Sequence, residues 1–251
     1  MNILLLMAGS SDAFKEAGYT YPKNLIEIEG QPLLQLVIEK LEGLIAADNH
    51  LICMVQREEN RRSYISSVIH LLVPNATVLE VNKETAGAAC TALLAIEHIN
   101  TADPLVIINS DQILEVDLSE IFSEFQRQKL DAGTIVFEAV HPRWSYVRCN
   151  SDEFVVEAAE KRPISKLATA GVYYFAQGQD FVEAAISMIK KDAHVGNQFY
   201  VCPVFNEMLL KHAKIGTHHI PRSTYFSLAN PQGLHIYEEH LHTHSNQLQH
   251  A

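Results

Sequence analysis

The first half of the chain alternates short apolar runs with segments whose apolar residues recur at helical spacing. The runs lie at residues 2–8, 50–56, 76–81 and 104–111, and the helical patterns begin near Pro32, Asn60 and Gly87. A run that is apolar throughout is typical of a strand covered on both faces. Strands that alternate with helices form right-handed crossovers and a parallel sheet. This half therefore predicts an α/β fold.

The pattern changes after about residue 130. Strand-like segments now follow one another closely, at residues 132–140, 145–150, 153–159 and 168–176. Helices are then expected at 179–191, 203–213 and 231–242, with a strand near 215–220. Closely spaced strands predict an antiparallel or mixed extension of the same sheet. The whole is a single domain over residues 1–242, built on a mixed, mainly parallel sheet flanked by helices. Its halves are about 1–130 and 131–242, and residues 243–251 are expected to form a flexible tail.

Charge and cysteine content limit the classes of partner and compartment. The chain of 251 residues has a net charge of −11, which argues against binding nucleic acid or an anionic membrane surface. No apolar run approaches the roughly 18 residues of a membrane span, and the N-terminal run is too short for a signal peptide. The four cysteines lie far apart without paired spacing, which indicates reduced thiols. We expect a cytoplasmic protein without membrane insertion; whether it forms a homo-oligomer stays open.

Ligands of open parallel sheets bind beyond the carboxyl ends of the strands, and three segments fall there: residues 8–14, 84–92 and 109–111. Gly9 lets the backbone approach a ligand, and the amides that follow can bind phosphate oxygens. The same loop also fits an ordinary turn. Lys23, shortly after it, is a candidate point charge for a triphosphate, although most lysines are simply solvated.

The next two segments carry a small-residue helix start and a carboxylate. Gly87 and Ala88 open a helix with little side-chain bulk, which suits a flat base or sugar against the backbone, or close packing of the helix on the sheet. Asp111 follows an apolar strand and can hold Mg²⁺ that bridges phosphates, or can cap a turn. Asp111 is the strongest single candidate.

A third group lies in the second half. Glu160 and Lys161 follow a strand-like segment, and Gly171 lies in the next one. Lys161 can neutralise a phosphate on an acceptor molecule, and Gly171 can let a sugar or similar group lie against the chain. The alternative is a solvated cluster of charges.

With these motifs in this order, the chain resembles the sugar-1-phosphate nucleotidyltransferases, also called sugar-nucleotide pyrophosphorylases. The segment "MAGSSDAFKEAGYTYPKNLI" is similar to the family's signature loop, "ETAGAACTALLAI" to its base-binding segment and "NSDQIL" to its metal-binding strand end. "EKRPISKLATAGVYYF" is similar to the acceptor-binding stretch, and "FSLANPQGLHIYEEHL" to a degraded form of the last motif. The resemblance covers nearly all of residues 1–242.

The resemblance implies a GT-A-like, Rossmann-like fold and a Mg²⁺-dependent reaction. A phosphorylated sugar or small metabolite attacks the α-phosphorus of a nucleoside triphosphate, and pyrophosphate leaves, for the synthesis of surface-polysaccharide precursors. Nucleotide-binding residues would be Ala8, Gly9, Ser10, Ser11, Lys23, Thr85, Ala86, Gly87, Ala88, Asn109 and Asp111. Acceptor-binding residues would be Glu160, Lys161 and Gly171. Lys23, Asp111 and Lys161 would be catalytic, and Asp111 would hold the metal. The short chain slightly favours CTP.

The chain also departs from the family pattern. Ser11 stands at a signature glycine and Ala13 at the signature arginine, and "YFSLAN" lacks the second metal-binding acid. The arginine's charge must come from elsewhere, for which Lys15, Arg143 and Arg148 are candidates. Otherwise the protein is a nucleotide-binding homologue without catalysis, or a GT-A-type glycosyltransferase that uses a nucleotide-sugar.

Overall fold

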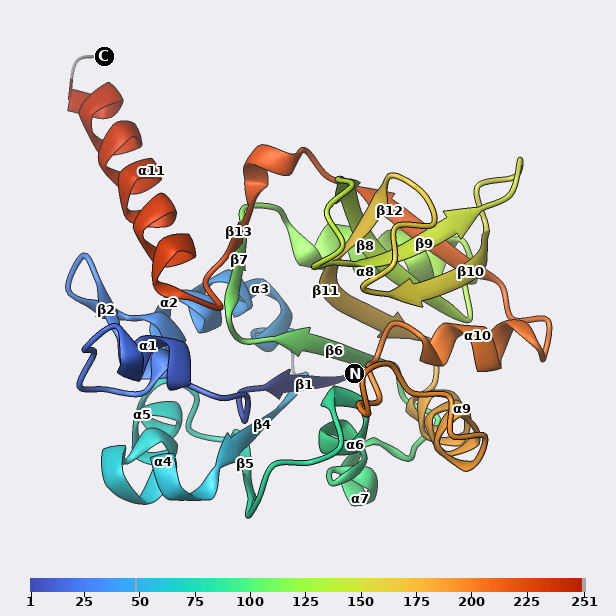
Figure 1. The fold of residues 1–251 in the computed structure, drawn as a ribbon, viewed down its shortest axis with the longest axis horizontal. Helices are drawn as coiled ribbons and strands as arrows, with labels where there is room; N and C mark the ends of the chain where they lie inside the picture. The colour runs from blue at the N-terminus through green and yellow to red at the C-terminus, as the bar shows by residue number, and fades with distance from the viewer. Residues whose placement is uncertain (48, 250–251) are drawn as a thin grey trace.

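A nine-stranded mixed sheet forms the centre of the computed structural model, which describes residues 1–47 and 49–249 (Figure 1). The strand order is β10-β9-β11-β6-β1-β4-β5, and β8 pairs with both β11 and β12. The strands are β1 (Asn2–Leu6), β4 (His50–Gln56), β5 (Thr77–Val81), β6 (Leu105–Asn109), β8 (Ala132–Glu138), β9 (Ser145–Cys149), β10 (Val155–Glu160), β11 (Leu167–Phe175) and β12 (Ile215–His219).

The two halves of the sheet differ in direction, as the sequence predicts. The strands β5, β4, β1 and β6 are parallel to one another. Strand β11 joins β6, β8 and β9 in antiparallel fashion, and β9 pairs with β10 in the same way. The α/β class and the mixed sheet within one domain are confirmed.

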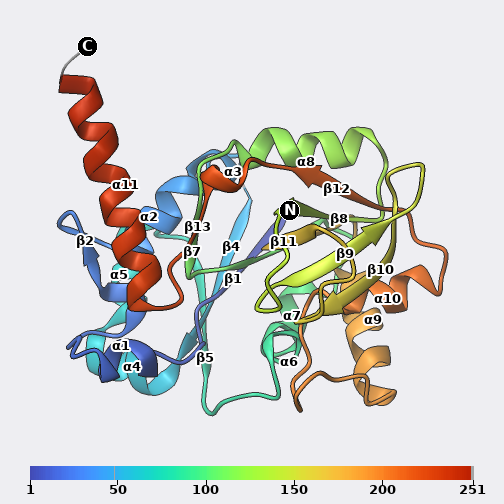
Figure 2. The same cartoon turned by 45° about the horizontal axis from the view of Figure 1, so that its top comes forward.

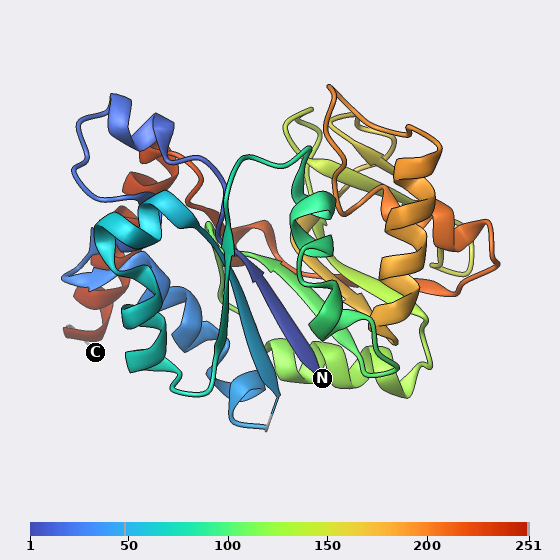
Figure 3. The same ribbon diagram turned by 90° about the horizontal axis from the view of Figure 1, so that it is seen from below.

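The sheet separates two apolar cores, which explains why its strands are apolar throughout. Ile3 and Leu5 face one core, whereas Leu4 faces the other. The first core is covered by α2 (Leu33–Lys40), α5 (Ile65–Leu72) and α8 (Leu118–Arg127). The second is covered by α6 (Ala88–Leu93), α7 (Ile96–Ile99), α9 (Gly178–Lys190) and α10 (Val204–Leu209). Figure 3 shows α2 and α5 on one side of β1 and β4, and α6, α7 and α9 on the other.

Several helix boundaries differ from the sequence-based expectation. The helix expected at 60–72 is two helices, α4 (Arg57–Ser63) and α5, because Tyr64 between them adopts a left-handed conformation with φ 54°. The helix expected at 87–99 is likewise divided into α6 and α7. Residues 8–14, expected as a loop, contain the start of the short helix α1 (Asp12–Glu16), and α3 (Glu42–Ile45) follows α2.

The amphipathic helix α8 was not predicted, although its sequence carries a clear signal. Asp117 caps it, since its side chain accepts hydrogen bonds from the amides of Ser119 and Glu120. Figure 2 shows α8 lying along the sheet.

The last helix, α11 (Pro231–Gln249), continues past residue 242, where the prediction ended it, because no glycine or proline interrupts it there. It projects from the edge of the fold (Figures 1 and 2). Residues 250–251 of the predicted tail lie outside the described residues. Within the described part of the chain, no helix combines the length and apolar character that crossing a bilayer requires.

Two short antiparallel pairs complete the fold. One joins β2 (Glu27–Ile28) to β3 (Gln31–Pro32), and the other joins β7 (Gln112–Leu114) to β13 (Tyr225–Ser227), with the 3₁₀ turns η1 (Lys23–Leu25) and η2 (Arg222–Thr224) nearby in sequence. The β7–β13 pair matters most for the site. It sets Ser227 opposite Gln112, beside the end of the central strand β6.

Candidate functional site

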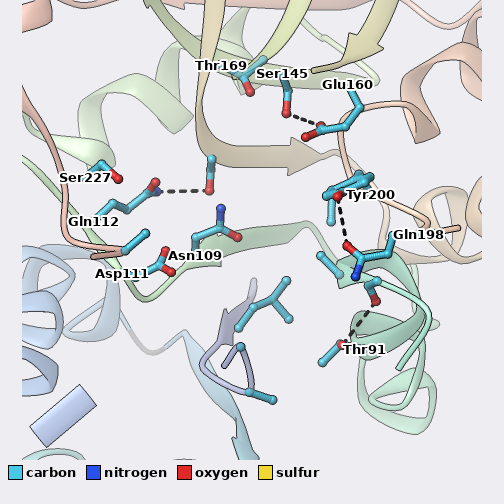
Figure 4. A pocket seen from close by; sticks show the side chains of 18 of the residues that line it. Thr91, Asn109, Asp111, Gln112, Ser145, Glu160, Thr169, Gln198, Tyr200 and Ser227 are labelled. Carbon is cyan, nitrogen blue, oxygen red and sulfur yellow. Dashed lines mark hydrogen bonds between the residues drawn. The ribbon is translucent and has the colours of Figure 1, made fainter. Parts of the chain in front are cut away.

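A pocket of about 520 Å³ lies beyond the carboxyl ends of β1, β5 and β6 and extends to β9, β10 and β11 (Figure 4). Most of the predicted site residues line it: Ala8, Gly9, Ser10, Lys23, Thr85, Gly87, Ala88, Asn109, Asp111, Glu160, Lys161 and Gly171. Ser11 and Ala86 lie outside this lining. The topology therefore brings the three predicted segments of the first half and the charged segment of the second half to one cavity.

An ion pair between Lys23 and Asp111 occupies the first end of the pocket. Lys23 Nζ donates to Asp111 Oδ2 at 2.8 Å, and the lysine side chain is only 6% exposed, against 25% for the aspartate. Gly9 makes room for this lysine, because a Cβ at residue 9 would lie 3.1 Å from Nζ. The lysine charge is thus neutralised within the chain.

Buried hydrogen bonds hold this pair in place. Ser11 is fully buried, and its hydroxyl accepts a hydrogen bond from the Lys23 amide at 3.1 Å. Asn24 donates to the Met7 carbonyl and accepts from Ser110, at 3.2 and 3.1 Å. Ser11 therefore positions the backbone of Lys23 rather than facing the pocket, which differs from its predicted contact with nucleotide.

Two glycines that were assigned to ligand approach lie against the protein's own chain. Gly87 has φ +113°, and a Cβ there would lie 2.4 Å from the carbonyl oxygen of Phe199. Gly171 has φ +64°, and a Cβ there would lie 2.6 Å from side-chain amide atoms of both Asn109 and Gln112. Both residues line the pocket, but their lack of a side chain is explained by internal packing.

The second end of the pocket is built around Glu160. This carboxylate is 8% exposed and accepts a hydrogen bond from Ser145, which faces it across the β9–β10 pair. Burial raises the pKa of Glu160, and the hydrogen bond from Ser145 opposes the shift. One oxygen of the predicted acceptor-binding carboxylate is therefore already engaged.

Lys161 is held next to Glu160 in a strained conformation. Its φ of 52° is left-handed, which is uncommon outside glycine and costs energy unless the surroundings enforce it. Its amide donates to the Trp144 carbonyl at 3.1 Å, and its Nζ donates to the hydroxyl of Tyr200 at 2.7 Å. The bond to Tyr200 is the main cause that raises the pKa of Lys161, so the lysine stays charged. Tyr200 in turn donates to Gln198 (Figure 4).

Some lining residues were not predicted from the sequence, chiefly Gln112, Thr169, Tyr173, Gln198, Tyr200 and Ser227. Gln112 links the two ends, because its amide donates to the Gly171 carbonyl at 3.2 Å and accepts from Tyr225 at 3.3 Å. Ser227 is placed by the pairing of β13 with β7. That pairing joins residues more than a hundred positions apart, so no local sequence pattern reports it.

The oxygen donors at the Asp111 end suit Mg²⁺ bound together with a nucleotide. No group of three or more His, Cys, Asp or Glu side chains within the described ranges is arranged to hold a metal ion. Asp111 instead stands with neutral oxygen donors of Asn109, Gln112 and Ser227 around the same part of the pocket (Figure 4). Mg²⁺ commonly takes one or two carboxylates and completes its shell with phosphates and water. The metal role of Asp111 stays a prediction that fits this donor set.

Of the three cations considered as substitutes for the signature arginine, one lines the pocket. Lys15 pairs with Asp12 at 3.2 Å on the exposed helix α1, and Arg148 pairs with Glu157 at 3.0 Å. Arg143 belongs to the pocket lining and lies over the ring of Trp144.

Comparisons with known proteins agree with this geometry. A family model described as nucleotidyl transferase matches residues 3–202. The bifunctional protein GlmU of Methanocaldococcus jannaschii is 30% identical over 178 residues, which is 70% of this chain and 40% of that protein. A putative mannose-1-phosphate guanyltransferase of Sulfolobus acidocaldarius is 20% identical over 177 residues, 70% of this chain and 48% of that protein. The match thus spans less than half the length of these curated relatives.

Among solved structures, the nucleoside-diphosphate-sugar pyrophosphorylase of Vibrio cholerae RC9 shares the fold. It superposes with a TM-score of 0.81 at 24% identity and covers 94% of this chain and 99% of its own. This likeness over most of the chain confirms the predicted nucleotidyltransferase type of fold.

Proposed function

Because the chain belongs to the nucleotidyl transferase family, we propose that it joins a nucleoside triphosphate to a phosphorylated sugar or another small phosphorylated molecule and releases pyrophosphate. One observation supports this most. A single pocket collects the Lys23–Asp111 pair from the first half of the chain and the Glu160–Lys161 segment from the second half. The two ends offer separate places for a nucleotide and an acceptor.

In the proposed reaction, an oxygen of the acceptor phosphate forms a bond to the α-phosphorus while the bond from that phosphorus to the bridging oxygen of pyrophosphate breaks. The attacking oxygen of a phosphomonoester is already largely ionised near neutral pH, so no general base is needed. Catalysis then depends on positioning the two substrates and on neutralising phosphate charge. Lys161 would hold the acceptor phosphate, and Lys23 would turn from Asp111 toward the triphosphate.

Asp111, with the neutral oxygens near it, would hold Mg²⁺. The bound ion would supply charge neutralisation on the phosphate oxygens. The oxygen of Glu160 that Ser145 does not engage would accept a hydrogen bond from an acceptor hydroxyl. We place the reaction in the cytoplasm, in the supply of precursors for surface polysaccharide. The base is identified by comparing the triphosphates in the assay below.

The test is pyrophosphate release from the five common nucleoside triphosphates, with Mg²⁺ and a panel of sugar 1-phosphates and phosphorylated alcohols. Activity with one pair should fall at least about a hundredfold in Lys161→Met, because a charged contact to the acceptor is lost. The matched control is Lys166→Met, whose lysine is exposed and paired with Glu138 at 3.3 Å. Equal activity in both variants would contradict the role of Lys161.

A homologue that binds nucleotide without catalysis is the second candidate, and the absence of an arginine at Ala13 favours it. Thermal melting with each triphosphate would then show stabilisation while pyrophosphate release stays undetectable. Release of a nucleoside diphosphate from a nucleotide-sugar would instead indicate a glycosyltransferase.

A further inference from the structure

Two cations flank the Ser145–Glu160 pair at the acceptor end of the pocket. Strands β9 and β10 pair in antiparallel fashion with Ser145 opposite Glu160. Arg143 comes two residues before that serine, and Lys161 comes directly after that glutamate. Both cations line the same pocket. The hairpin therefore brings two positive charges to one end of the cavity.

Both cations are held against aromatic rings instead of carboxylates. The Arg143 guanidinium carbon lies 4.4 Å from the ring centroid of Trp144, and Lys161 Nζ lies 5.0 Å from that of Tyr200. Within the described part of the chain, neither forms a salt bridge with an acidic side chain. By contrast, Arg148 and Arg162 of the same hairpin both pair with Glu157, at 3.0 Å. Glu160 interacts with Lys161 electrostatically, but neither cation forms an ion pair among the described residues. In a protein with 30 acidic and 19 basic residues, two such cations in one pocket point to an anionic ligand.

Contacts of Trp144 place its neighbour Arg143 on the side of the acceptor end that faces Asp111. The ring of Trp144 lies 5.6 Å from that of Tyr225, whose hydroxyl contacts Gln112, the neighbour of Asp111. On the other side, the carbonyl of Trp144 accepts the hydrogen bond from the Lys161 amide. Burial and the charge of Asp111 raise the pKa of Tyr225, and the charges of Arg222 and, more weakly, Arg143 oppose this shift. Arg143 thus stands on the wall where an acceptor phosphate would approach the α-phosphorus.

We propose that Arg143 and Lys161 together clamp the acceptor's phosphate, so that the acceptor is a phosphomonoester bound through two cations. The inference rests on the proposed function and adds a residue to it. A guanidinium presents two parallel N–H groups to a phosphate, and the Trp144 ring beneath it limits where the exposed Arg143 side chain lies.

The test separates the acceptor from the triphosphate in the steady-state kinetics of pyrophosphate release. Arg143→Gln should raise the KM of the acceptor about tenfold to a hundredfold and leave the KM of the triphosphate nearly unchanged. Arg143→Lys should recover part of the loss, because the charge returns without the bidentate geometry. The matched control is Arg148→Gln, which removes the same charge from the same hairpin outside the pocket and should change neither constant.

Two outcomes would overturn the clamp: an acceptor KM that changes less than about twofold in Arg143→Gln, or a loss that falls on the triphosphate instead. If the wild-type protein releases no pyrophosphate with any pair, the proposed function fails, and the clamp is tested with inorganic phosphate alone. Phosphate should then raise the melting temperature of the wild type and of Arg148→Gln more than that of Arg143→Gln. Equal shifts in all three proteins would refute the clamp independently of the reaction.

Discussion

Removing Asp111 should lower the free energy of unfolding more than removing its ion-pair partner Lys23. Removing one member of a buried ion pair leaves the other charge uncompensated, at a cost of about 3–5 kcal/mol when that charge is fully buried. The side chain of Lys23 is 6% exposed, whereas that of Asp111 is 25% exposed and can be hydrated. Asp111→Ala leaves the buried ammonium without its acceptor and should lower the free energy of unfolding by about 3 kcal/mol. Lys23→Met keeps the apolar stem and should cost only about 1 kcal/mol.

Urea denaturation followed by circular dichroism measures both costs. The double variant should be more stable than the sum of the single losses predicts, by about 1–2 kcal/mol, because it leaves no uncompensated charge. Lys166→Met removes a lysine whose pair with Glu138 is 73% exposed on both sides, and should change stability by less than about 0.5 kcal/mol. The reasoning is wrong if Lys23→Met costs as much as Asp111→Ala, or if neither differs from the Lys166 control.

Three further predictions concern packing, pH and thiol reactivity. Gly87→Ala should destabilise the fold by at least about 2 kcal/mol, because the new Cβ would collide with the backbone of Phe199. The control Gly18→Ala is also at positive φ, but its Cβ would meet none of the described atoms within 4 Å, so it should cost only about 1 kcal/mol. Comparable melting temperatures for the two variants would count against the packing role of Gly87. Burial raises the pKa of Glu160 above 4.5 in the folded protein. The protonated side chain therefore contributes stability below about pH 4.5, and this contribution is lost as the pH rises through the folded-state pKa. Glu160→Gln should flatten the dependence of the unfolding free energy on pH in this range, and an unchanged slope would contradict the prediction. Burial raises the pKa of Cys53 to about 12 and that of Cys202 further, so neither should react with a thiol reagent at about pH 8 until urea is added; rapid labelling of either in the native protein would show that it is accessible.

The central strands could be predicted from the sequence, because a strand buried on both faces is a short continuous apolar run. The run His50–Gln56 is strand β4 residue for residue, and the end of each central strand fell within a few positions of its prediction. Helix α8 also has a local sequence signal, since Leu118, Ile121 and Phe125 lie at helical spacing after the cap at Asp117. It could therefore have been predicted. The break at Tyr64 could not be predicted, because a left-handed conformation is uncommon for tyrosine and no glycine or proline marks the position.

The site also has features that local sequence patterns predict and features that depend on contacts between distant residues. Motif order predicted which segments would meet, since the carboxyl ends of parallel strands share one edge. For Gly87 the sequence left ligand approach and internal packing open, and the contact with Phe199 favours packing. Gly171 was expected to make room for a sugar, whereas the side-chain amides of Asn109 and Gln112 occupy that space. A glycine in a sequence reports that something comes close, but not whether it is ligand or chain. The β7–β13 pairing and the partners of Glu160 depend on contacts distant in sequence, which single-sequence reasoning could not supply.

Strand β11 has a mechanical consequence. Its C-terminal residues, Val172–Phe175, are hydrogen-bonded to β6 in the first half, while Leu167 and Ala168 pair with β9 in the second. The two ends of the pocket therefore share one continuous strand, which resists a hinge motion that would separate them as rigid bodies. Any bending has to concentrate where the pairing with β8 shifts register, between Thr169 and Tyr173, around the left-handed Gly171. The distance between the two ends of the pocket should therefore change little when substrates bind, and side chains and loops should account for most of the movement.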